Sequence, residues 1–326
     1  MPLKWFLDNE GNKLLISDCL EKGLLSNEYP LSYLAVCADQ REWNGKPSTT
    51  QLISGTRCEY LKLFTPYAEN PAEQAFRILG TKSHKKLEDL TPEGSLSEFK
   101  CSDDEISGIA DLLEKQPNGE WWLTDYKTWG SYKVMLGIGL KAKKRPAFRE
   151  DGKPVLYVKS GKWGKAGEQK TETYYEPDPK FVDMYEVELQ LNRYRIITEK
   201  NYNIKISKLK TFAIVRDGGC ISAINRGVDK NTYYIDVKIL DDNLVNNYFT
   251  KKREALLYSV EGYIKDENET WADGRSGEYP EEGFDFDLIK KHAPQLCTNK
   301  ETWNGRKCEK FCPVKEICDR ISYAKN

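Results

Sequence analysis

The sequence predicts an α/β fold, and three observations support this prediction. Apolar residues recur at helical spacing in four long segments of the chain. Shorter strand-like runs lie between these segments, so helices and strands alternate along the sequence. Of the 326 residues, 39% are apolar, which is enough to form a packed core.

The helices are expected at residues 51–64, 72–90, 183–200 and 241–264. Residues 47–50 (Pro-Ser-Thr-Thr) offer N-cap side chains to the first helix, and Asp241 or Asp242 caps the last. A break that contains proline and asparagine, at 66–71, separates the first helix from the second.

Three strand-like runs in the middle of the chain predict an antiparallel meander. They span residues 97–101, 106–113 and 121–127, and polar turns at 102–104 and 117–119 separate them. Two further strands are expected, at 209–215 and 233–240.

Shifts in composition divide the chain into three parts. Residues 1–47 are interpreted as an N-terminal arm and residues 48–264 as the core. A segment at 129–180, rich in glycine, lysine and proline, interrupts the core as an insertion of loops and short strands. Residues 265–326 are expected to form an acidic linker, up to 283, followed by a cysteine-rich end.

The formal net charge of -1 excludes binding to polyanions through the overall field, so any nucleic-acid contact must be local. Between Lys133 and Lys170 there are eleven Lys/Arg and three Asp/Glu, with aromatic residues interleaved. This composition fits a surface that grips a nucleic-acid strand, and it also fits a solvated, lysine-rich loop. No run is apolar enough to span a bilayer and no signal peptide is evident, so we expect a cytoplasmic protein without a membrane partner.

Two acids and a lysine in neighbouring strands form the central chemical signal. Asp111 closes the sequence Gly-Ile-Ala-Asp, and Asp125 and Lys127 flank Tyr126 in the next strand. Residues two apart in a strand share a face, so Asp125 and Lys127 point the same way and Asp111 can lie beside them. Two carboxylates with a lysine suit Mg²⁺- or Mn²⁺-assisted hydrolysis of a phosphodiester, although Asp-x-Lys alone is common on solvated strands.

Two helical segments add candidate residues. His84 lies four residues after Gly80 on the second helix, and Glu88 follows one turn later. Gln190 and Tyr194, four residues apart, share one face of the third helix. Each pair alone is also compatible with ordinary structural roles.

The order of these motifs resembles that of a known enzyme family. Gly-x-x-x-His, Gly-x-x-Asp, Asp-x-Lys and Gln-x-x-x-Tyr follow one another as in the RecB-like branch of the PD-(D/E)XK nucleases, from about residue 48 to Tyr194. The resemblance implies a restriction-endonuclease-like fold, in which helices flank a mixed sheet and residues 48–264 form the nuclease core.

The resemblance also implies roles for the individual residues. His84, Asp111 and Asp125 would bind the metal ion, with the Tyr126 carbonyl as an additional ligand. Lys127 would be the catalytic base or orient the attacking water. Gln190 and Tyr194 would shape the site and engage DNA, and Glu88 and Glu98 would have supporting roles.

Four of the nine cysteines gather at the C-terminal end and indicate a second site. Cys308, Cys312 and Cys318 have the close spacing of metal or cluster ligands. The fourth ligand could be Cys58, far away in sequence, or the nearby Cys297. Cys19, Cys37, Cys101 and Cys220 are interpreted as small core residues.

One early and three late cysteines resemble the iron–sulfur subgroup of these nucleases, which includes the AddB nuclease domain and CRISPR-associated exonucleases. This resemblance implies a 4Fe-4S cluster on Cys58, Cys308, Cys312 and Cys318, held in a C-terminal helical cap. Three residues separate Cys308 from Cys312, where the subgroup usually has two, so a zinc site that includes Cys297 stays open.

The expected function is therefore a metal-dependent DNA nuclease. By the same resemblance, the substrate would be single-stranded DNA ends, with 5′-to-3′ degradation favoured, in recombination, repair or phage DNA processing. The alternative is a non-catalytic DNA-binding or scaffold protein with a zinc-binding cysteine cluster.

Overall fold

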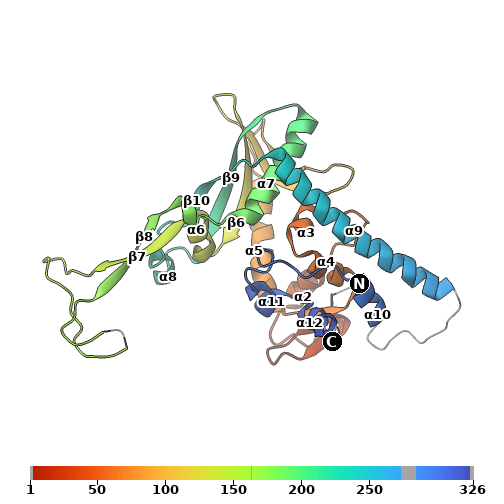
Figure 1. The fold of residues 1–326 in the computed structure, drawn as a ribbon, viewed down its shortest axis with the longest axis horizontal. Coiled ribbons are helices and arrows are strands. Elements are labelled where there is room, and N and C mark those ends of the chain that lie inside the picture. The colour runs from red at the N-terminus through yellow and green to blue at the C-terminus, as the bar shows by residue number, and fades with distance from the viewer. Residues whose placement is uncertain (1–2, 163, 273–283, 324–326) are drawn as a thin grey trace.

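Five strands form a mixed sheet at the centre of the structure, a computed structural model that describes residues 3–162, 164–272 and 284–323 (Figure 1). In sheet order they are β10 (Thr232–Val237), β9 (Ile206–Val215), β6 (Trp121–Trp129), β5 (Ile109–Lys115) and β4 (Leu96–Lys100). Strands β4, β5 and β6 are antiparallel neighbours, which confirms the predicted meander. Strand β9 runs parallel to β6, and β10 is antiparallel to β9.

Helix α7 (Tyr185–Tyr202) covers one face of this sheet. It belongs to the connection between the parallel strands β6 and β9, which cannot be joined by a tight turn. Val187 and Leu191 of the helix share a core with Leu123 and Leu209, and successive side chains of each strand point to opposite faces of the sheet. This alternation fixes which strand residues face α7 and which face the other way.

Helix α5 (Pro71–Glu88) lies against β6 and carries His84. The Asn70 side chain caps its first turn, Pro71 occupies the first helical position, and Lys85 and Lys86 lie in the last turn. The predicted helix at 72–90 is thus present with slightly shifted ends.

Both ends of the described chain pack into a second core. A three-stranded sheet pairs β1 (Leu3–Leu7) with β2 (Lys13–Leu15) and β3 (Tyr67–Glu69). The helices around it are α1 (Ile16–Glu21), α2 (Leu31–Ala38), α3 (Thr49–Ile53), α4 (Thr56–Phe64), α9 (Asp242–Ala272), α10 (Phe286–His292), α11 (Arg306–Phe311) and α12 (Lys315–Tyr323). Phe6, Tyr60, Phe249 and Ile321 meet in this core, so the segment read as an arm is packed against both the middle and the end of the chain.

Two expected helices differ in extent from those observed. The helix predicted at 51–64 is divided into α3 and α4, because Ser54 adopts an extended backbone and Gly55 passes against the Cys297 sulfur. Helix α9 begins after Asp241, whose side chain accepts a hydrogen bond from the Leu244 N–H (3.0 Å). It ends at Ala272, so the first part of the expected linker is helical, and residues 273–283 lie outside the described residues.

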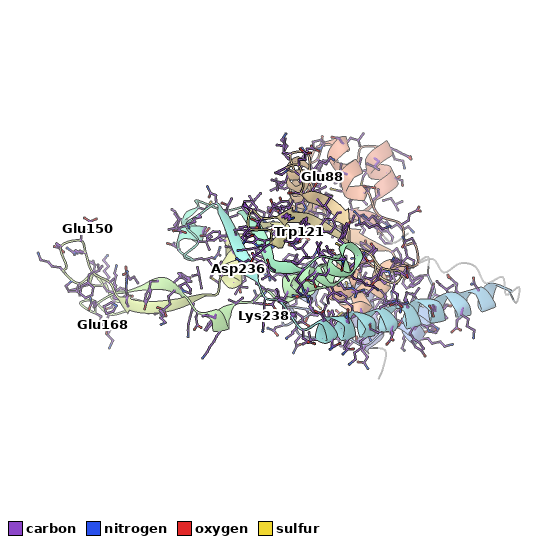
Figure 2. All side chains as sticks on the ribbon, turned by 90° about the horizontal axis from the view of Figure 1, so that it is seen from above. Glu88, Trp121, Glu150, Glu168, Asp236 and Lys238 are labelled. Atoms are coloured by element: carbon purple, nitrogen blue, oxygen red, sulfur yellow. The ribbon has the colours of Figure 1, made fainter. Side chains whose placement is uncertain are left out.

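The insertion folds into a projecting ribbon. After α6 (Ser131–Gly137), strands β7 (Leu140–Pro146) and β8 (Thr171–Pro177) pair along their full length, and the short 3-10 helix η1 (Pro179–Phe181) follows. Figure 1 shows this ribbon extending away from the rest of the molecule, and Figure 2 places Glu150 and Glu168 at its far end. Near its base lies the short helix α8 (Ile221–Ile224). None of the helices in the described ranges has the length and apolar character needed to cross a bilayer.

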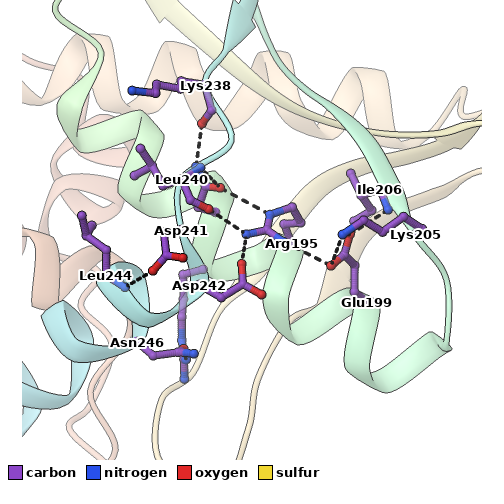
Figure 3. A network of polar contacts seen from close by, with 12 residues as sticks. Arg195, Glu199, Lys205, Ile206, Lys238, Leu240, Asp241, Asp242, Leu244 and Asn246 are labelled. Atoms are coloured by element: carbon purple, nitrogen blue, oxygen red, sulfur yellow. Dashed lines mark hydrogen bonds and ion pairs between the residues drawn. The ribbon is translucent and has the colours of Figure 1, made fainter.

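A buried arginine joins α7 to the connection between β10 and α9 (Figure 3). The Arg195 guanidinium donates to Glu199 (3.2 Å) and to the Leu240 carbonyl (3.3 Å), and it is paired with Asp242. Asn192 of the same helix accepts from the Leu240 N–H (2.9 Å). The network satisfies backbone groups that no regular element reaches, and so fixes the start of α9 on the sheet.

We predict that Arg195→Ala lowers the free energy of unfolding by about 2 to 3 kcal/mol, because hydrogen bonds to charged groups are lost in a buried setting. Chemical denaturation followed by circular dichroism measures this change. Arg145→Ala is the matched control, since Arg145 pairs with Glu172 on the exposed ribbon, and its cost should stay below about 1 kcal/mol. Equal losses in the two variants would contradict an anchoring role for Arg195.

Candidate functional site

The sheet register brings three acids into one row. Ser97 pairs with Leu112 and Phe99 with Ala110, so Glu98 lies across from Asp111. Leu112 pairs with Thr124, which puts Asp125 next in line on β6. Residues that face each other across antiparallel strands share a face of the sheet, and the three carboxylates therefore converge.

The ladder between β5 and β6 stops where this row crosses it. Pairing ends at Leu112 and Thr124, and beyond it the Asp111 carboxylate accepts a hydrogen bond from the Tyr126 N–H (2.6 Å). The N–H and C=O of a strand residue project from the same edge, so the Tyr126 carbonyl also faces the side where Asp111 lies. This geometry is compatible with the ligand role predicted for that carbonyl.

His84 meets two of the acids. Its Nδ1 atom lies 3.7 Å from Asp111 Oδ1 and 3.8 Å from Glu98 Oε1. Potential ligand atoms of these three residues all lie within 4.8 Å of one another, which no other group of His, Cys, Asp and Glu achieves among the described residues. Octahedral ligands about 2.1 Å from Mg²⁺ are roughly 3.0 Å apart when adjacent and roughly 4.2 Å apart when opposite, so the observed separations fit a shared ion.

Glu98 has a more central position than the sequence indicated. It was expected only to support the site, yet it joins His84 and Asp111 while the similarly ranked Glu88 pairs with Lys85. Its backbone has a φ of 44°, in the left-handed region that a non-glycine residue rarely adopts. Such strain costs about 1 to 3 kcal/mol and gathers at functional sites.

Burial raises the pKa of Asp111 to about 8, helped by the negative charge of Asp125 and opposed by the positive charge of Lys127. The chain itself therefore does not fully compensate the carboxylates that it places side by side. A bound cation would supply that compensation and favour the ionised form.

Asp125 and Lys127 form an ion pair inside the site. The Lys127 Nζ atom lies 2.7 Å from Asp125 Oδ1, whereas Asp125 Oδ2 is buried and has no hydrogen-bond partner within the described ranges. Burial opposes the charge on Lys127, but Asp125 and Asp111 raise its pKa above the ordinary value. The lysine is thus held protonated by the same acids that could hold a metal ion.

Helix α7 places its predicted pair beside the lysine. Lys127 Nζ lies 3.5 Å from Gln190 Oε1, and Gln190 Nε2 lies 3.4 Å from the Tyr194 hydroxyl oxygen. Burial raises the pKa of Tyr194, so it is a neutral hydroxyl at physiological pH. Gly108 passes so close that a Cβ atom there would lie 2.6 Å from the Tyr194 ring, which explains a glycine three residues before Asp111.

The candidate cluster cysteines lie in one region, between α4 and the C-terminal helices. Cys58 of α4 and Cys312, which ends α11, have sulfurs 3.8 Å apart, and the Cys58 thiol lowers the pKa of Cys312 to about 7. The charges of Cys312, Cys297 and Cys318 help burial to raise the pKa of Cys308. Both candidates for the fourth ligand, Cys58 and Cys297, are therefore close to the other thiols.

Buried positions were predicted for four other cysteines. Cys19, Cys37 and Cys101 are buried as expected. Cys220 is exposed at the start of α8, so its prediction as a core residue was wrong. Cys220, like the three buried cysteines, stands alone in the sequence, and residue type by itself does not separate a buried cysteine from an exposed one.

Comparisons with known proteins leave the family undefined. No protein-family model matches the chain, and no curated protein matches it. A crystal structure of a protein named SSO0001 aligns over 68% of this chain and 81% of its own, at 13% identity. Its TM-score of 0.32 is too low to support a conclusion about fold or function.

We predict that Glu98→Gln weakens Mn²⁺ binding at least ten-fold, because losing a residue that merely supports a metal ligand already costs about 10- to 100-fold. Isothermal titration calorimetry with Mn²⁺ measures the change. Glu114→Gln is the control, since Glu114 is a partly buried acid on β5 that faces away from Asp111. Unchanged affinity in Glu98→Gln would remove Glu98 from the proposed ligand set.

Proposed function

We propose that this chain is a metal-dependent DNA nuclease of the RecB-like PD-(D/E)XK type, with a restriction-endonuclease-like core. The observation that carries the proposal is the convergence of His84, Asp111 and the Asp125–Lys127 pair, from one helix and two strands. Residues from three separate motifs of the sequence thus lie in one site. A non-catalytic scaffold would not require this combination of buried charges, which is costly to maintain.

The residues present fit a Mg²⁺ or Mn²⁺ ion. His84, Asp111, Asp125 and the Tyr126 carbonyl would hold it, and we add Glu98 to this set because of its distance to His84. Carboxylate and carbonyl oxygens are the ligands that these hard cations prefer. The unpartnered Asp125 Oδ2 supports the assignment, since buried polar atoms rarely lack a partner. The bound ion would polarise the phosphodiester and lower the pKa of a water molecule.

Lys127 would act on the water and the phosphate. Its protonated Nζ atom is held between Asp125 and Gln190, so it can donate a hydrogen bond to a phosphate oxygen or orient the attacking water. The Tyr194 hydroxyl contacts the Gln190 side-chain amide and would keep its oxygen directed towards Lys127. The helix thereby controls the position of the catalytic lysine.

For the cysteine site we propose a 4Fe-4S cluster on Cys58, Cys308, Cys312 and Cys318, in a C-terminal helical cap. Zinc held by Zn–S bonds of about 2.3 Å would put neighbouring sulfurs about 3.8 Å apart. The Cys58 and Cys312 sulfurs have this separation (3.8 Å), so the proposal of a cluster rests on the resemblance of the cysteine pattern, and zinc is the alternative.

The projecting ribbon supports DNA as the partner. Residues 147–170, beyond the paired strands, contain six Lys/Arg and three Asp/Glu, whereas cations of the paired part are matched by acids such as Glu172 and Glu176. Phe148 and Val158 are exposed in the same segment. Excess positive charge and exposed apolar side chains suit a grip on phosphates and bases.

By the same resemblance we propose single-stranded DNA ends as substrate, with 5′-to-3′ degradation favoured, in recombination, repair or phage DNA processing. Incubation of the anaerobically purified protein and Mn²⁺ with DNA labelled at the 5′ or 3′ end tests this. The label released first reports polarity. A protein that carries its metal yet leaves the DNA intact would favour the DNA-binding or scaffold alternative.

We predict that Lys127→Ala slows cleavage by about 10²- to 10⁴-fold, the usual contribution of a positioned proton-transfer group. Asp125→Ala, which removes a proposed metal ligand, should slow cleavage at least as much. Binding of the same DNA should change little, because neither side chain is needed for the contacts of the ribbon. Lys22→Ala, which removes an exposed lysine from the N-terminal part, is the control. Cleavage at the wild-type rate by either site variant would show that the active site lies elsewhere.

We predict that Cys58→Ser removes the brown colour of an iron–sulfur protein and lowers its thermal stability, because the cluster closes a loop of more than 200 residues. Iron analysis and visible absorption, with a thermal melt, measure both effects. Cys297→Ser is the matched variant and should keep its iron. If Cys297→Ser loses the metal and Cys58→Ser keeps it, Cys297 is the fourth ligand.

A further inference from the structure

The face of the central sheet that points away from α7 carries an aromatic row, defined as Trp122, Tyr126, Phe212 and Tyr234. These residues alternate along their strands with Leu123, Asp125 and other side chains that face the helix. Neighbouring rings have centroids 6.1 to 6.5 Å apart and meet at tilted or edge-on angles. The row therefore crosses three strands without interruption.

One end of the row lies at the candidate metal site. The His84 ring packs edge-on against Tyr126, with centroids 6.0 Å apart, while its Nδ1 atom faces Asp111 and Glu98. The same histidine thus contacts both the proposed ligands and the first ring of the row. A ligand bound along the row would therefore extend to the candidate metal site.

The other end of the row is open and flanked by lysines. Tyr234 is 45% exposed, and Lys208 Nζ lies 4.6 Å from the centroid of the Trp122 ring. Lys210 lies over both Trp122 and Tyr234, at 5.1 and 4.9 Å. A continuous patch of partly exposed aromatic side chains is typical of a binding surface. The neighbouring lysines would attract an anionic ligand.

Acidic groups on this face limit its positive charge. Asp236 pairs with Lys210 (2.6 Å), Glu120 accepts a hydrogen bond from the Trp122 ring N–H (3.1 Å), and Glu114 lies across from Trp122. The face is therefore suited to stacking rather than to neutralising many phosphates. That balance favours unpaired bases, whose faces are accessible, over a duplex, whose bases are covered by one another.

We propose that the aromatic row is a stacking track on which single-stranded DNA lies as it approaches the metal site. The inference rests on the proposed nuclease function and adds a binding surface for its substrate. Trp122 and Tyr234 would stack on bases, and Lys208 would contact the backbone. The ribbon and the track then hold the nucleic acid by different physical means.

Fluorescence anisotropy with a labelled oligothymidylate, in Ca²⁺ instead of Mn²⁺, tests the track apart from cleavage. We predict that Tyr234→Ala and Trp122→Ala each weaken binding roughly 5-fold or more, because each removes one base–aromatic stack. The salt dependence of the remaining affinity should not change, because no phosphate contact is removed. A duplex of the same length should bind wild type and variants alike.

Two controls separate stacking from other causes. Tyr234→Phe keeps the ring and loses only the hydroxyl contact with Thr124, so it should bind within two-fold of wild type. Tyr258→Ala removes an even more exposed ring from α9 and should have no effect. Thermal melts of all variants verify that the sheet is intact.

Undiminished single-strand affinity in both Tyr234→Ala and Trp122→Ala would overturn the track, as would a wild-type protein that does not bind the oligonucleotide. A change in oligomeric state with unchanged DNA affinity would also overturn it and assign the face to a protein contact. Wild-type cleavage in Mn²⁺, measured separately, distinguishes the two proposals. If ring removal weakens binding but the wild type never cuts, the track stands and the nuclease proposal fails.

Discussion

The hydrogen bond from the Tyr126 N–H to the Asp111 carboxylate is the interaction on which the candidate site depends. It replaces a backbone partner with a side chain at the point where β5 and β6 stop pairing. The exchange keeps the Tyr126 amide satisfied while the strand edge stays open towards His84. If the hydrogen-bond ladder between β5 and β6 continued, it would occupy the strand edge that the proposed metal ion needs. The interruption of the ladder is therefore what makes room for the proposed metal site.

A second constraint holds the two ends of the chain together around α4. The buried Arg57 side chain donates to the Pro294 carbonyl (2.8 Å), and Lys252 of α9 donates to the Ser54 carbonyl (2.7 Å). Cys58 and Cys312 are 254 positions apart in sequence and yet in contact. Loop-closure entropy grows only with the logarithm of loop length, so the proposed cluster would fix both ends of the chain at little additional entropic cost.

Periodicity and turn residues predicted the long helices and the five strands of the central sheet, because burial on one face imposes spacing on the sequence. They could not predict where local rules fail. The φ of Glu98 is imposed by its neighbours, and no residue in its segment announces a left-handed backbone within a strand. The break before Gly55 depends on Cys297, more than 200 residues later. Sequence order predicted that Asp111, Asp125 and Lys127 would meet, but the place of Glu98 required the register.

The strand-like run that predicted β6 also contains two rings of the aromatic row, Trp122 and Tyr126. Alone, those rings read as ordinary strand residues, and only the pairing with β9 and β10 joins them to Phe212 and Tyr234. A net charge of -1 is then no obstacle to binding DNA. The charge at the ribbon end and the proposed stacking on the sheet are both local, so neither would depend on the net charge of the molecule.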